Sequence, residues 1–286
     1  MLEALQFEFM RNAIMAGLMA SLICGIMGTL VVVNRVVFLS GGIAHAAYGG
    51  IGLSFFMGWP FLAGTMGFAL VSAFIMAAVT LKAKHRADTI IGVTWAVGMA
   101  LGIVLLDLTP GYHVDLMSYL FGSILTVPTT DLLIMLAVGI IVFIVVGYFY
   151  KDFIAMAYDE EFAKARGVPV RWLYFLLIGI LALSIVMIIQ VVGLILVIAM
   201  LTIAPYMVEK YTKSMLAMML WSGLLNICFT LCGLWLAFRF NLTSGAAIIL
   251  VAGTVFALDF VYQSVAAKKS REMTQQSVME KTQSHV

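Results

Sequence analysis

Three side chains in this sequence have the types and positions that suit a divalent metal ion. His45 lies inside a long apolar segment, whereas His113 and Asp115 lie two residues apart in a more polar stretch, 107–130. Imidazole nitrogens together with carboxylate oxygens favour borderline metals such as zinc or manganese. The alternatives are a structural histidine that is hydrogen-bonded to a backbone carbonyl, and a loop that is polar only because water surrounds it.

The segment around His45 is rich in small residues. Gly42, Ala46 and Gly50 recur every four residues, the spacing that lets two helix backbones approach closely inside a membrane. An ionisable side chain is costly where it faces lipid, so it faces protein or a water-filled path. The sequence therefore predicts an internal helix near the centre of a bundle, with His45 on it.

A third group of residues predicts a short helix over 159–168. Acidic residues open it and cationic residues close it, in agreement with the helix dipole, and Glu160 and Lys164 form a pair in the favoured order. Gly167 fits the position just past the helix end. A helix this short needs a surface to dock on, and Phe162 is its one large apolar residue. We interpret it as a two-turn coupling helix that seats in a cytoplasmic motor subunit, with a plain interfacial helix as the alternative. The residues assigned to it are Asp159, Glu160, Glu161, Phe162, Lys164, Arg166 and Gly167.

Nine apolar segments must position these residues, and many have close to the roughly 20 residues that cross a bilayer as a helix. With the joint at 151–171 placed in the cytoplasm, 14 of the 16 Lys and Arg residues fall on that side, and only Arg11 and Arg239 fall outside. Cytoplasmic loops hold most cations in membrane proteins, so this asymmetry predicts the N-terminus outside and the C-terminus in the cytoplasm. The segments are expected at 11–33, 39–57, 60–81, 88–106, 131–150, 172–189, 191–206, 214–237 and 244–263.

The composition agrees with this threading. A hydrophobic content of 64% and a charged content of 10% exclude an ordinary soluble domain. We therefore expect an all-α polytopic membrane protein with eight to nine transmembrane helices and one short coupling helix. A transmembrane domain is predicted over 1–267, and a disordered cytoplasmic tail over 268–286. Asp259, near the cytoplasmic end of the last segment, either reaches the interface or pairs with a neighbour.

Several stretches together resemble the permease family of metal-ion ABC importers, which serves zinc, manganese or iron(II) uptake. The resemblance covers nearly the whole chain, and its pieces follow one another in the family's order. It implies a transport subunit in the cell (inner) membrane that moves a divalent transition metal, zinc or manganese first, by alternating access. The stretches are 9–17 with 45–47, 88–92, 115–122, and 192–205 with 244–250.

The resemblance also implies the partners. ATP hydrolysis belongs to a separate cytoplasmic ATP-binding subunit, and the chain carries no G-x-x-x-x-G-K-[ST] motif for holding ATP phosphates itself. A metal-binding extracytoplasmic protein delivers the ion, and two permease copies form a homodimer. The chain is then no enzyme, binds no cofactor of its own and binds no nucleic acid. The metal-path residue that the resemblance implies is His45. His113 and Asp115 are candidates for the metal entry site because of their residue types in the external loop.

One departure from the family concerns the path itself. The family often has an Asp four residues before the histidine of the second segment, and the pair is thought to line the metal path. Here that position is Gly41, and the Ser before the histidine is Ala44. Of that Asp–His pair only His45 is present in this chain. The missing carboxylate therefore bears on which metal the protein selects.

Two other classes of function are weighed. An ion-coupled secondary transporter or a channel predicts paired ionisable groups at the membrane midplane and an internal repeat. A membrane enzyme requires a nucleophile with a base, or paired carboxylates on facing helices. Of the four histidines only His45 lies within a predicted span, which argues against both.

Overall fold

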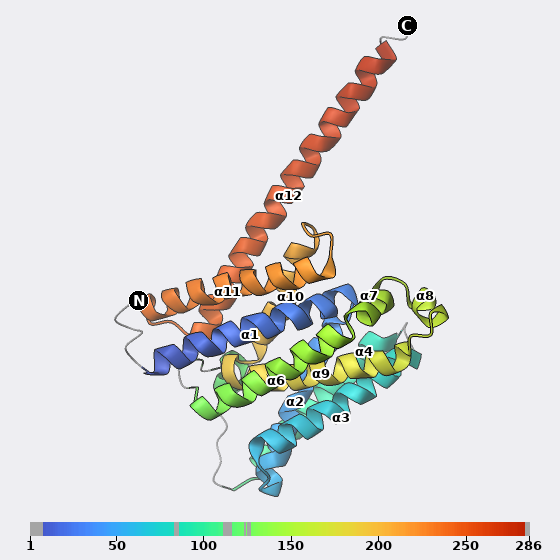
Figure 1. Ribbon diagram of the computed structural model, residues 1–286. Coiled ribbons are helices and arrows are strands. Elements are labelled where there is room, and N and C mark those ends of the chain that lie inside the picture. Colours follow the sequence, from blue (N-terminus) through green and yellow to red (C-terminus); the bar gives the residue numbers. More distant parts are fainter. Residues whose placement is uncertain (1–7, 83–85, 111–115, 123, 125–126, 284–286) are drawn as a thin grey trace.

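The computed structural model describes residues 8–82, 86–110, 116–122, 124 and 127–283, and beyond residue 265 it describes the backbone alone. Each long segment of these residues is helical, as the sequence predicts (Figure 1). The helices are α1 (Glu8–Val33), α2 (Val37–Met57), α3 (Phe61–Lys82), α4 (Ala87–Asp107), α5 (Leu116–Phe121), α6 (Thr129–Tyr148), α7 (Tyr150–Tyr158), α8 (Glu160–Ala165), α9 (Val170–Val192), α10 (Leu194–Glu209), α11 (Met215–Phe240) and α12 (Ser244–Gln283).

Within this described part, seven helices are long and apolar enough to cross a membrane: α1, α3, α4, α6, α9, α11 and the Ser244–Val265 part of α12. Two more predicted segments are present as α2, which has 21 residues and is rich in glycine, and α10, which has 16 residues. Both pack against the longer helices. The expected polytopic all-α fold with eight to nine transmembrane helices is therefore confirmed.

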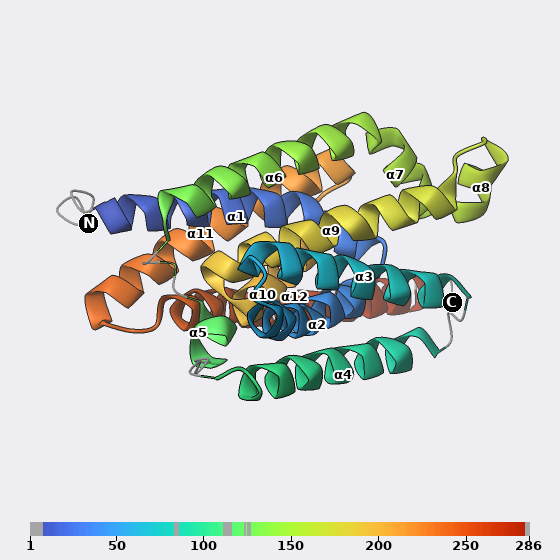
Figure 2. The ribbon, with the colours of Figure 1, turned by 90° about the horizontal axis from the view of Figure 1, so that it is seen from below.

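Two hydrogen bonds show how three of the helices run relative to one another, in agreement with the predicted alternation. Asn12 Nδ2 donates to the Val127 carbonyl at 3.1 Å, and Gln190 Nε2 donates to Asp131 Oδ2 at 3.2 Å. These bonds gather the start of α1, the start of α6 and the end of α9 at one end of the bundle. The helices α7 and α8 lie at the opposite end (Figure 2).

Small residues bring α2 into close contact with its neighbours. An added Cβ at Gly42 would lie 2.5 Å from Ile91 Cγ2 of α4, and one at Gly50 would lie 2.7 Å from the Thr65 Cα of α3. Ala46, between them along the helix, is fully buried. The predicted internal position of this helix is confirmed. Close packing of this kind holds helices together in lipid, where apolar surfaces gain little by meeting.

A junction of three glycines connects segments that are far apart in the sequence. Gly193, the single residue between α9 and α10, has φ 87° and ψ 162°, a region that only glycine occupies without strain. An added Cβ there would lie 2.9 Å from the Cα of Gly122, which follows α5. Gly245 at the start of α12 packs against the Phe121 carbonyl at the same place. We call Gly122, Gly193 and Gly245 the glycine junction.

The region after α6 differs from the prediction. The expected span at 131–150 ends as α6 at Tyr148, the chain turns at Phe149, and α7 follows as a separate helix. The Phe149 ring centroid lies 5.4 Å from that of Trp172 in α9 and 6.5 Å from that of Phe153 in α7. These contacts favour the turn and come from tertiary packing, so the local sequence gives no sign of it.

The last helix, α12, continues past the predicted end of its span at residue 263. Its backbone stays helical as far as Gln283, and this extension leaves the bundle (Figure 1). A helical segment that leaves its bundle is held by its own propensity, which is small. The division into a domain over 1–267 and a tail over 268–286 without stable structure stays a prediction.

We expect Gly193→Ala to destabilise the protein markedly. The backbone at this residue is one that alanine adopts only with strain of about 1–3 kcal/mol, and the new methyl group would collide with Gly122. Thermal unfolding in detergent and the fraction of monodisperse protein measure the effect. The matched control is Gly253→Ala in α12, where an added Cβ meets nothing within 4 Å. Equal melting temperatures of the two variants would contradict the assigned importance of the glycine junction.

Candidate functional site

His45 has a ring nitrogen that none of the described residues reaches with a hydrogen bond. Its side chain is partly buried on α2, and among the described residues no hydrogen bond reaches the buried Nδ1 atom. The imidazole stacks on the Trp95 indole of α4, with ring centroids 4.1 Å apart and an angle of 18° between the planes. Stacking therefore holds the ring in place, and Nδ1 is not engaged by a backbone carbonyl.

Gly41 lies one turn before His45, on the same face of α2. An added Cβ at Gly41 would be 3.9 Å from Ile198 Cδ1, so this face is turned toward α10. Both residues are only partly buried. The position that often carries a carboxylate in the resembling family thus adjoins the imidazole, and in this chain it supplies no ligand.

The rest of the predicted metal set is not assembled by the residues that can be described. Across them, no three His, Cys, Asp or Glu side chains gather in a cluster that could hold an ion. His113 and Asp115 lie outside the described residues. The structure therefore places His45 and leaves its relation to the other two predicted residues untested.

The segment that follows Asp115 docks next to His45. The Tyr119 hydroxyl of α5 donates to the Ala44 carbonyl at 3.2 Å, and its ring meets the Tyr48 ring edge-on at 4.9 Å between centroids. Sequence analysis identified the 115–122 stretch but not this contact. The sequence does contain one indication of it, a tyrosine within a short apolar stretch. A buried phenol usually finds a hydrogen-bond partner, so this tyrosine could have been expected to bond to a neighbouring helix.

The helix α8 begins and ends as the sequence predicts. Asp159 Oδ1 accepts a hydrogen bond from the backbone N–H three residues later, at 2.9 Å, and so caps the first turn. At the other end the Gly167 N–H donates to the Lys164 carbonyl and the Val168 N–H to the Ala163 carbonyl, each at 3.0 Å. These are the paired bonds of a Schellman motif. Gly167 has φ 81°, which glycine adopts readily.

The surface of α8 is mostly turned away from the bundle. The helix has six residues, fewer than the two full turns expected. Ala163 is buried and seats it on the bundle, whereas Phe162 is 53% exposed. The Arg166 guanidinium lies 5.6 Å from the Phe162 ring centroid. An ion pair joins Lys164 Nζ to Glu160 Oε1 at 2.7 Å, and its exposure to solvent makes its contribution to stability small.

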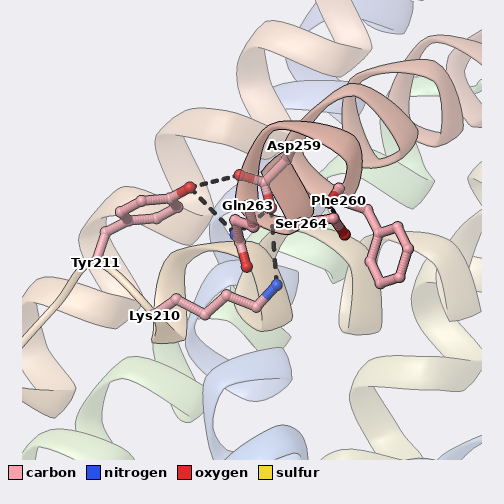
Figure 3. A network of polar contacts seen from close by, with 6 residues as sticks. All are labelled: Lys210, Tyr211, Asp259, Phe260, Gln263 and Ser264. Carbon is pink, nitrogen blue, oxygen red and sulfur yellow. Dashed lines mark hydrogen bonds and ion pairs between the residues drawn. The ribbon is translucent and has the colours of Figure 1, made fainter. Parts of the chain in front are cut away.

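A polar network joins the end of α10 to α12 (Figure 3). The Tyr211 hydroxyl donates to Asp259 Oδ1 at 2.5 Å, and Gln263 Nε2 donates to Asp259 Oδ2 at 2.7 Å. The Lys210 ammonium lies 3.8 Å from Asp259 Oδ2 and 4.7 Å from the Tyr206 ring centroid. The hydrogen bond to Asp259 raises the pKa of the Tyr211 phenol. Of the two alternatives for Asp259, the structure shows pairing.

Comparison with known proteins identifies the family. The profile described as the ABC 3 transport family matches residues 6–263. The chain belongs to the ABC 3 transport family. This membership, over most of the chain, confirms the resemblance to metal-ion ABC importer permeases that the sequence stretches indicated.

Relatives within the ABC 3 transport family match over nearly their full length. An uncharacterized membrane protein of Synechocystis is 47% identical over 263 residues, 92% of this chain and 94% of the relative. The manganese import system permease protein ScaB of Streptococcus gordonii is 32% identical and covers 89% of this chain and 91% of its own. A chain in the solved structure of PsaBC from Streptococcus pneumoniae in complex with Fab is 32% identical, with a TM-score of 0.82 over 91% of this chain and 94% of that one.

We expect Tyr211→Phe and Asp259→Asn to lower the melting temperature, and the double variant to lower it by less than the sum. The two side chains share one hydrogen bond, so either substitution weakens the same interaction. Thermal unfolding of the four proteins in detergent measures the cycle, with Tyr262→Phe, an exposed tyrosine of α12, as the control. If the double variant lowers the melting temperature by the full sum of the two single effects, the network does not tie α10 to α12.

Proposed function

We propose that this chain is the membrane-spanning permease subunit of an ATP-driven importer for a divalent transition metal, manganese or zinc. The observation that carries the proposal is the family match over residues 6–263. Relatives that cover nearly the whole chain at about one-third identity and are named manganese permeases favour manganese. An ion-coupled secondary transporter or channel is the alternative, and no described feature favours it.

Energy comes from a separate ATP-binding subunit on the cytoplasmic side. The chain lacks a phosphate-binding loop, and α8 offers an exposed aromatic ring with charges around it at one end of the bundle. The cation asymmetry assigns that end to the cytoplasm of the inner membrane and the N-terminus to the outside. A metal-binding extracytoplasmic protein then docks at the end that carries α5. Two copies of the chain form the complete path.

Metal passes His45 and is held there only weakly. The imidazole has a buried nitrogen that no described residue reaches with a hydrogen bond, and the neighbouring position, Gly41, has no carboxylate. Conduction requires binding that is favourable enough for the ion to enter and weak enough for it to leave. His113 and Asp115 are proposed to hold the ion at the outer mouth.

We expect His45→Ala to lower metal uptake several-fold while leaving the amount of folded protein nearly unchanged. Loss of the imidazole removes a ligand from the path but only one stacking contact, with Trp95, from the fold. Uptake of manganese, zinc and iron(II) by proteoliposomes with the complete importer measures the effect and ranks the metals. The control is His285→Ala, in the predicted tail. Normal uptake of all three metals by the His45 variant would remove His45 from the path.

We expect Phe162→Ala to weaken binding of the ATP-binding subunit about tenfold. Burying a large apolar side chain contributes about 1.5–3 kcal/mol, and about 1.4 kcal/mol corresponds to a factor of ten in affinity. Titration of the ATP-binding subunit against the immobilised permease measures this. The control is Trp59→Ala, an aromatic residue with similar exposure, 54%, in the turn between α2 and α3. If the Phe162 variant retains wild-type affinity, α8 is only a linker.

A further inference from the structure

A groove of about 440 Å³ lies between α1, α6 and α11, and Tyr150 of α7 closes one end of it. Its floor is buried and apolar, with Ile23 and Met219 at most 6% exposed. Its rims are apolar side chains that are turned outward, such as Leu22 and Phe143, at 53% and 69% exposure. The groove is therefore open along the side of the bundle rather than enclosed within it.

Two glycines of α6 make room for the groove. Gly139 and Gly147 both line it, and they are eight residues, a little over two turns, apart along the helix. An added Cβ at Gly147 meets nothing within 4 Å, and one at Gly139 lies 3.3 Å from Ile23 Cδ1. The neighbouring helices leave the space at Gly147 empty, so glycine is not there to permit close helix packing.

The helices α1, α6 and α11 are all long and apolar enough to cross a membrane. A groove that is open along their side meets hydrocarbon wherever a second copy of the protein does not cover it. Volumes of about 300–1,000 Å³ are typical of sites that take small ligands. The lining offers almost no polar atom, so a flexible hydrocarbon chain is the ligand that matches it. Such a chain gains dispersion contacts with the buried floor that bulk lipid does not make with a smooth helix surface.

Two lysines lie close in the sequence to lining residues at the end of the groove near α7. Lys151 follows the lining residue Tyr150, and Lys213 lies three residues before the lining residue Leu216. Both lysines are exposed, whereas the neighbouring Asp152 is partly buried. Basic residues between helices at a membrane surface recognise anionic lipid headgroups.

We propose that this groove binds one acyl chain of an anionic phospholipid, whose phosphate lies between Lys151 and Lys213. The glycines of α6 leave space for the acyl chain, and the two lysines attract the anionic headgroup of the same lipid. The site is distinct from the face of α2 that carries His45, and it requires only that the chain spans a membrane.

The test is lipid binding by the purified full-length chain, measured by native mass spectrometry with phosphatidylglycerol and phosphatidylcholine. We expect the wild-type chain to bind one phosphatidylglycerol in preference to phosphatidylcholine, with no competition from inorganic phosphate. Gly147→Leu fills the groove without a clash and should weaken this binding about tenfold or more, since buried methylenes supply most of the affinity. Lys151→Gln with Lys213→Gln should abolish the preference between the two lipids while the acyl chain still binds.

Matched controls are available for both substitutions. Gly67→Leu in α3 also enters open space on the membrane face, and Lys82→Gln removes an exposed cation at the end of α3. Both should bind phosphatidylglycerol as the wild-type chain does. Wild-type binding by Gly147→Leu, or equal loss in Gly67→Leu, would overturn the proposal. A change in dimerisation of Gly147→Leu with unchanged lipid binding would also overturn it, in favour of a second copy as the occupant. Transport is not measured, so this result is independent of the proposed function.

Discussion

Backbone contact at glycine is the constraint on which the rest of this structure depends. Apolar helix surfaces gain little by meeting in lipid, so close approach has to supply the packing energy. The glycine junction fixes α5, the break between α9 and α10, and the start of α12 against one another. Because α5 also carries Tyr119, whose hydroxyl reaches the Ala44 carbonyl, the junction determines where α5 meets the helix of His45.

How much of this could be read from the sequence depends on how local each feature is. The internal position of α2 follows from small residues spaced within that one helix, and both ends of α8 are fixed by bonds within 159–168. The turn at Phe149 follows Gly147 by two residues, but one glycine inside a long apolar segment does not predict where the helix ends. The turn rests on Trp172 from another helix. The three residues of the glycine junction likewise meet although they are more than 50 positions apart in the sequence. Such contacts are set by the tertiary arrangement, which a single sequence does not show.

The helix α10 owes its shape to its neighbours. It begins at a glycine with positive φ and contains Pro205, which has no N–H to donate to the Leu201 carbonyl. Asn226 of α11 supports the same turn, because its Nδ2 donates to the Met200 carbonyl at 3.0 Å. The glycine junction holds the first end of α10, and the polar network around Asp259 holds the other. A helix with a glycine start and an internal proline is thus held at both ends as well as by packing along its length.

This arrangement gives a continuous physical route between the two candidate sites. The capped helix α8 contacts α9, and α9 passes into α10 through one residue, Gly193. α10 in turn lies beside the face of α2 that carries Gly41 and His45. A force applied to Phe162 would act on a helix that is rigid for its length, because both its ends are capped. Bending would then concentrate at Gly193, where the backbone leaves the helical conformation, and at Pro205, which has no N–H to donate. Movement there would change what lies next to Gly41, one turn before His45. An imidazole whose neighbour at position 41 carries no carboxylate would release an ion readily when that happens.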